Sequence, residues 1–79
     1  MKNFFTANAI LSDNTIISIM VVDDNDKYTL SITILPKGYY KADKKYSKII
    51  NKDKDLYSII EDEVRSISKS SDYKITFNF

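Results

Sequence analysis

Residues 15–22, Thr-Ile-Ile-Ser-Ile-Met-Val-Val, decide what kind of fold this chain can adopt. The segment is rich in β-branched side chains, which favour a β-strand. Because side chains alternate between the two faces of a sheet, this strand places apolar groups on both faces. The rest of the chain predicts only one helix, and one helix covers one face. Apolar surface therefore remains on the other face.

The segments on either side of this strand predict an antiparallel meander of three strands. Residues 3–11 and residues 27–35 alternate between apolar and polar side chains, as strands do. Residues 12–14 (Ser-Asp-Asn) and 23–26 (Asp-Asp-Asn-Asp) are short polar turns, and asparagine tolerates left-handed backbone angles. Pro36 ends the third strand.

The second half of the chain predicts one helix and one further strand. Within residues 55–69, apolar side chains recur at spacings of three and four, which builds one stripe along a helix. Residues 73–79 alternate again. We therefore predict a single compact α+β domain over residues 1–79. It has a four-stranded, mostly antiparallel sheet with one helix packed on one face, in the order βββαβ. The last strand can lie beside the first or the third.

Residues 37–54 are the least regular part of the chain. They contain seven Lys and two Asp, a local net charge of +5, interleaved with three tyrosines. This segment is either a loop with one helical turn or a short strand near residues 46–50. Ammonium groups neutralise phosphates and tyrosine rings stack on bases, so the composition also suits a nucleic-acid contact. The alternative is a basic surface that docks on an acidic protein.

The composition excludes several kinds of site. The 79 residues include no Cys and no His, which removes disulfides, thiolate metal sites and the usual general base. The Asp cluster at 23–26 fails as a calcium loop, because Tyr28 and Ile34 occupy the positions that need Gly and Glu. We interpret Glu61, Asp62 and Glu63 as a solvated helix face. We expect no enzyme, no catalytic residue, no cofactor and no metal site.

The expected compartment is the cytoplasm. No apolar run is long enough to span a membrane, and the two Phe before Ala7-Asn8-Ala9 fall short of the roughly 7–15 apolar residues of a signal peptide. A chain without Cys is compatible with the reducing cytosol. The abundance of Lys, Ile, Asn and Asp is typical of an AT-rich genome, for example that of a low-GC bacterium or its phages.

The apolar surplus is the main functional clue. If the helix covers the face of Ile17, Ile19 and Val21, the other face carries Phe4, Ile10, Ile16, Met20, Val22 and Leu35. Burying such a side chain is worth about 1.5–3 kcal/mol, and a contiguous exposed patch usually marks an interface. Alternatively, residues 37–54 fold back and cover this face.

We therefore expect a non-catalytic protein-interaction module that acts by docking on, or occluding, a partner protein. By analogy alone, this profile fits phage or mobile-element inhibitors of host systems. The alternative is a small nucleic-acid-binding protein that uses residues 37–54. The candidate partner-binding residues lie in that segment and on the apolar face: Tyr39, Tyr40, Lys41, Lys44, Lys45, Tyr46, Lys48, Ile16, Met20 and Val22. The last three also form a candidate self-association patch, which would make a homodimer.

Overall fold

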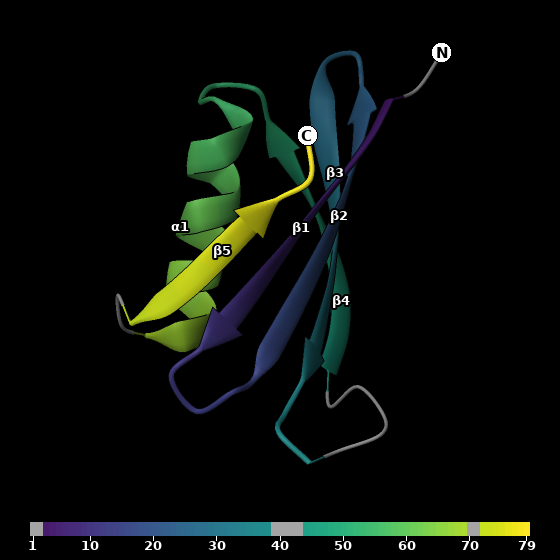
Figure 1. The fold of residues 1–79 in the computed structure, drawn as a ribbon. Coiled ribbons are helices and arrows are strands. Elements are labelled where there is room, and N and C mark those ends of the chain that lie inside the picture. Colours follow the sequence, from purple (N-terminus) through teal and green to yellow (C-terminus); the bar gives the residue numbers. More distant parts are fainter. Residues whose placement is uncertain (1–2, 39–43, 70–71) are drawn as a thin grey trace.

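The computed structural model of this chain describes residues 3–38, 44–69 and 72–79. Five strands form one antiparallel sheet in the order β4-β3-β2-β1-β5, and a single helix, α1, lies across one face of it (Figure 1). The elements are β1 (Asn3–Leu11), β2 (Ile16–Asp24), β3 (Lys27–Leu35), β4 (Lys44–Asn51), α1 (Leu56–Ser68) and β5 (Tyr73–Phe77).

The α+β class and the helix on one face are confirmed, but the prediction of four strands was wrong. Residues 44–51 form an additional strand, β4, which pairs antiparallel with β3. Its sequence, KKYSKIIN, lacks the apolar alternation that identifies the other strands, because it lies at the edge of the sheet and is largely exposed. The alternative of a short strand near residues 46–50 was therefore correct, and β4 extends beyond it at both ends.

The extra strand also settles where the last strand lies. β4 runs antiparallel to β3 along one edge, α1 crosses the sheet, and β5 pairs antiparallel with β1 at the opposite edge. The order of elements is therefore ββββαβ. α1 connects the two edge strands: it begins after the end of β4 and ends before the start of β5, on one side of the sheet (Figure 1).

The core lies between α1 and the helix-facing side of the three central strands. Ile17, Ile19 and Val21 of β2 are at most 2% exposed. Ala7 and Ala9 lie opposite Ile19 and Ile17 on β1, and α1 comes closest to β1 and β5. The small alanine side chains allow this approach. The apolar stripe of the helix supplies the buried residues Leu56, Ile59, Ile60 and Val64.

Local hydrogen bonds fix the ends of the helix. Asp55 is the N-cap, and its carboxylate accepts hydrogen bonds from the backbone N–H and the hydroxyl of Ser58, at 2.9 and 3.1 Å. These two bonds lower the pKa of Asp55. Lys69 ends the helix in the left-handed conformation, with φ 58°, and its N–H donates to the carbonyl of Arg65. Asn14 and Asn25 also adopt positive φ in the two hairpin turns.

An isoleucine-to-alanine substitution should lower the free energy of unfolding by different amounts on the two sides of the sheet. Ile60 is 0% exposed, whereas Ile10 on the opposite face is 50% exposed. We expect Ile60→Ala to lower the free energy of unfolding by about 3 kcal/mol, because it leaves a cavity. Ile10→Ala should cost less than about 1 kcal/mol. Urea denaturation of both variants measures the difference, and equal costs would contradict the assignment of the core face.

Candidate functional site

The face of the sheet opposite α1, here called the open face, carries its side chains in cross-strand rows. Phe4, Val22, Thr29 and Ile49 lie directly opposite one another on four strands and form the Phe4 row. Ile10, Ile16 and Leu35 form the Ile16 row at the other end of the same strands. Both rows are mainly apolar. They are the surplus surface that the sequence predicts.

Most apolar side chains of this face are in contact with water. Phe4 is 65%, Ile10 50%, Ile16 39%, Met20 48% and Ile49 68% exposed. Val22 and Leu35 are half-buried. The described part of residues 37–54 adds β4 to the edge of the sheet and leaves these five residues exposed. Residues 39–43 lie outside the described residues.

Two rows of mainly polar side chains separate the apolar rows, and we call them the polar band. It holds Thr6, Met20, Ser31 and Ser47 in one row, and Thr76, Asn8, Ser18, Thr33 and Lys45 in the next. A hollow of ≈ 360 Å³ lies over the band. The Ser18 hydroxyl donates a hydrogen bond to Asn8 Oδ1 at 3.1 Å. The open face is therefore two apolar strips on either side of a hollow whose lining combines Ser and Thr hydroxyls with the apolar side chain of Met20.

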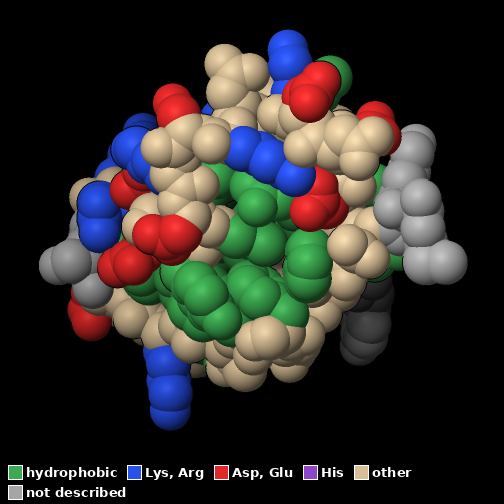
Figure 2. Space-filling view, turned by 90° about the horizontal axis from the view of Figure 1, so that it is seen from above, with side chains coloured by type: hydrophobic (Ala, Val, Ile, Leu, Met, Phe, Trp, Pro, Cys, Tyr) green, Lys and Arg blue, Asp and Glu red, His purple; other side chains and the backbone are tan. Residues whose placement is uncertain are grey.

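Aromatic side chains gather where β1 begins and β5 ends. The rings of Tyr57 and Phe77 lie 4.9 Å apart, and Phe79 lies 5.2 Å from Phe5 and 5.7 Å from Phe77. Figure 2 shows this end of the molecule, with hydrophobic side chains at the centre and charged ones mainly above and to the left of them. Tyr57 is 49% and Phe79 39% exposed. Sequence reasoning missed this cluster because its members come from both ends of the chain and from the helix.

The structure divides the candidate residues of the basic segment between the two faces of β4. Tyr46 and Lys48 are on the helix side, and so is Lys44, whose Nζ lies 5.5 Å from the centre of the Tyr46 ring. Lys45 is on the open face, together with Ile16, Met20 and Val22. The structure therefore does not gather the candidate residues into one site. Tyr39, Tyr40 and Lys41 lie outside the described residues.

Three lysines of the basic segment are held by carboxylates of the same chain. Lys48 Nζ lies 2.8 Å from Glu63 Oε1, and Lys54 Nζ lies 3.0 Å from Asp62 Oδ2. Lys52 pairs with Asp23, and its Nζ lies 4.9 Å from the centre of the Tyr28 ring. These contacts reduce the positive charge that the segment offers to an external ligand.

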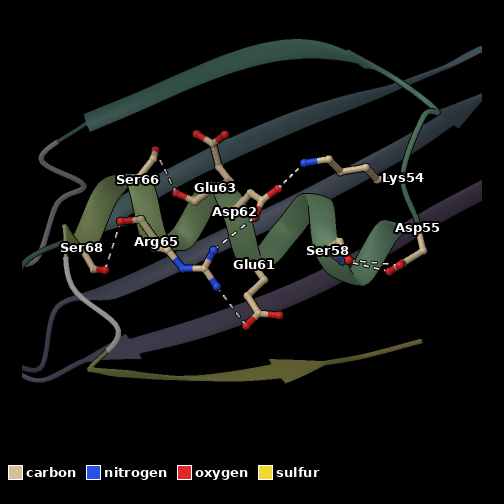
Figure 3. Close-up of polar contacts among 9 residues, drawn as sticks. All are labelled: Lys54, Asp55, Ser58, Glu61, Asp62, Glu63, Arg65, Ser66 and Ser68. Atoms are coloured by element: carbon tan, nitrogen blue, oxygen red, sulfur yellow. Dashed lines mark hydrogen bonds and ion pairs between the residues drawn. The ribbon is translucent and has the colours of Figure 1, made fainter.

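The interpretation of Glu61, Asp62 and Glu63 as one solvated face was wrong for Glu63. Its side chain is 6% exposed, and it points from α1 towards β4, whereas Glu61 points the other way (Figure 3). The Tyr46 hydroxyl donates to Glu63 Oε2 at 2.6 Å, and Lys48 donates to Oε1 at 2.8 Å. A buried carboxylate needs partners that offset its loss of water, and Tyr46 and Lys48 provide them. Both belong to β4, which the sequence does not identify as a strand, so the burial of Glu63 was not predicted.

The Glu63 network is a structural connection between β4 and α1. The helix lies closest to β1 and β5, and longer side chains fill the space on the β4 side. A hollow of ≈ 300 Å³ remains beside the network and is lined by charged groups of both signs, among them Lys54, Asp53 and Asp62. Burial raises the pKa of the Tyr46 hydroxyl, and the hydrogen bond to Glu63 and the Glu63 charge raise it further.

Comparison with family models, curated proteins and solved structures finds no match for this chain. Within residues 3–38, 44–69 and 72–79, no group of three acidic, His or Cys side chains is placed to hold a metal ion. No helix in the same residues has the length and apolar character needed to cross a membrane.

Removing Lys48 and removing the charge of Glu63 should lower the free energy of unfolding by different amounts. Lys48→Met leaves the Glu63 carboxylate, 6% exposed, with one hydrogen bond, which should cost about 2 kcal/mol. Glu63→Gln leaves the Lys48 ammonium, whose side chain is 45% exposed and reaches water, so we expect a cost near 1 kcal/mol. Urea denaturation at neutral pH measures both. A larger loss for Glu63→Gln would contradict the burial of the carboxylate.

Tyr46 should ionise at a higher pH than a tyrosine in an unfolded chain. Its folded-state pKa lies above the unfolded value of about 10, so the folded state prefers the protonated hydroxyl. The stability that this preference contributes is present below pH ~10 and is lost as the pH rises towards the folded-state pKa. Absorbance titration should show one late tyrosine that Tyr46→Phe removes. A late component that persists in this variant would assign the shift to another residue.

Proposed function

We propose that this chain is a non-catalytic protein-interaction module that docks on a partner protein through its open face and acts by occlusion. The observation that carries the proposal is the exposure of five large apolar side chains on that face: Phe4, Ile10, Ile16, Met20 and Ile49. Each would gain about 1.5–3 kcal/mol from full burial. A partner that covers both apolar rows would recover a large part of this free energy.

The arrangement of charge on the open face supports docking. Within the Phe4 row, the polar band and the Ile16 row, the charged side chains at described positions are Lys45 and Lys74, and both lie on edge strands. Asp24 and Lys27 lie one row beyond the Phe4 row, at the rim of the open face. Interfaces are depleted of charge at their centre and polar at their rim. The backbones of β1, β2 and β3 are paired on both sides, so the central side chains are already held in place. Such preorganisation lowers the entropic cost of binding.

The polar band supplies hydrogen-bonding groups without the means to activate them. Its hydroxyls belong to Ser and Thr, and the register places no carboxylate at the described positions of the band, because Asp24 lies beyond the Phe4 row. A serine nucleophile needs an adjacent base. This chemistry suits hydrogen bonding to a partner or to water, and it supports binding over catalysis.

Nucleic-acid binding through residues 37–54 is the competing hypothesis. It requires ammonium groups that can neutralise phosphates and release counterions. Lys48, Lys52 and Lys54 already pair with carboxylates of the chain. These intramolecular ion pairs favour protein docking over nucleic-acid binding.

A matched pair of variants tests the proposal. Met20 on the open face and Tyr57 on α1 are 48% and 49% exposed, so Met20→Glu and Tyr57→Glu add the same charge at equally exposed positions. We expect a partner captured from the source organism to bind Tyr57→Glu like the wild type. Its affinity for Met20→Glu should fall at least ~100-fold, because the charge loses water without gaining a counter-charge.

Salt dependence separates the two hypotheses in the same experiment. Docking through the apolar rows should change little with salt, whereas nucleic-acid binding weakens with a slope near one per phosphate contacted. Equal capture of the partner by Met20→Glu and the wild type would overturn the role of the open face. Steep salt dependence that Lys44→Glu and Lys45→Glu abolish would instead support nucleic-acid binding.

A further inference from the structure

We infer that the partner of the open face is a second copy of this chain, packed face to face around a two-fold axis. The inference rests on the proposed function, namely that the open face is a protein-docking surface. In a two-fold dimer the same patch is buried on both subunits, so the patch must be complementary to itself. The rows of the open face meet this condition.

The self-complementarity follows from the register. The apolar Phe4 and Ile16 rows lie at opposite ends of the strands, with the polar band between them. A two-fold axis that runs across the strands, between Ser18 and Met20 of β2, exchanges the two ends. The Phe4 row of one copy then lies on the Ile16 row of the second copy, and each polar band lies on the other. Phe4 meets the second copy's Ile10, and Val22 meets its Ile16.

The position of Asp24 selects this axis over the alternative. Asp24 lies on the open face of β2, opposite Lys27 of β3 and one row beyond the Phe4 row. A two-fold axis parallel to the strands and centred on β2 would place Asp24 over the second copy's Asp24, and like charges that approach one another in a partly dry interface are unfavourable. With the axis across the strands, β4 lies over the second copy's β4, Lys45 faces its Ser47, and the two Asp24 side chains lie at opposite ends of the interface. The charge pattern therefore favours dimer strands that cross near antiparallel.

The hollow over the polar band fits this arrangement. Thr6, Asn8, Ser18, Ser31 and Thr33 line it, and the proposed axis passes close to its centre. The two hollows, each ≈ 360 Å³, would face one another and enclose bridging water. Water-mediated hydrogen bonds satisfy hydroxyls at little cost, so the band need not be dry. The apolar rows on either side would seal the chamber from bulk solvent.

The size of the face is sufficient for a dimer. Five strands at ~4.8 Å spacing and a length of nine residues at ~3.3 Å each give a flat footprint of roughly 600–700 Å² per copy. A standard interface buries about 800 Å² per partner. Two sheets pack face to face about 10 Å apart in this way. A chain of 79 residues has a small core of its own, and dimer formation would enlarge it.

Sedimentation equilibrium across micromolar to millimolar concentrations tests the second copy as the occupant. We expect the mass to rise from 9.2 kDa to twice that value, and Tyr57→Glu to behave like the wild type. Met20→Glu should weaken self-association at least ~100-fold while its circular dichroism spectrum stays unchanged. A wild type that remains monomeric throughout would overturn this inference. The proposed function would survive that result if capture of another protein still depended on Met20.

Disulfide cross-linking between introduced cysteines tests the direction of the two-fold axis. The chain has no native Cys, so each cross-link can form only between the introduced residues. A mixture of Phe4→Cys and Ile10→Cys proteins should form a mixed disulfide on mild oxidation. Ser66→Cys, exposed on α1, is the control for random collision and should not cross-link. If Phe4→Cys instead couples preferentially to Thr29→Cys, the axis runs along the strands and the proposed arrangement is wrong.

Discussion

A single helix covers a single face of the sheet, and the rest of this structure follows from that imbalance. β2 is apolar on both faces, so burying Ile17, Ile19 and Val21 under α1 directs Ile16 and Met20 to the opposite side. A shift of register by one residue would only exchange the two sets. The elements that the structure describes therefore leave part of the sheet's apolar surface in contact with water, and the open face is the consequence.

Two adjustments keep the single helix in place over five strands. The alanines of β1 let α1 approach one half of the sheet, and the Glu63 network connects it to β4 on the other half. A buried carboxylate is costly unless it is paired, so Glu63 contributes mainly by fixing how β4 and α1 are placed. Because Tyr46 and Lys48 bind Glu63, they are not available to bind a partner protein.

The sequence predicts most of the fold because alternation and helical periodicity mark every element that contributes an apolar face to the core. β4 is the exception: it is a lysine-rich edge strand, and edge strands carry such charges to resist pairing with other chains. Without β4, the burial of Glu63 was not predictable. The apolar residues of the open face were predictable, but their separation into two rows was not, because it depends on the cross-strand register.

Solvent labelling of Met20 tests the central claim most directly. The account predicts that Met20 oxidises rapidly in dilute solution, at a rate close to that of an unstructured methionine, and that concentrating the protein slows the reaction as a second copy covers the open face. Slow oxidation of a protein that sediments as a monomer would contradict this claim. It would mean that the chain itself covers the face that we assign to a partner.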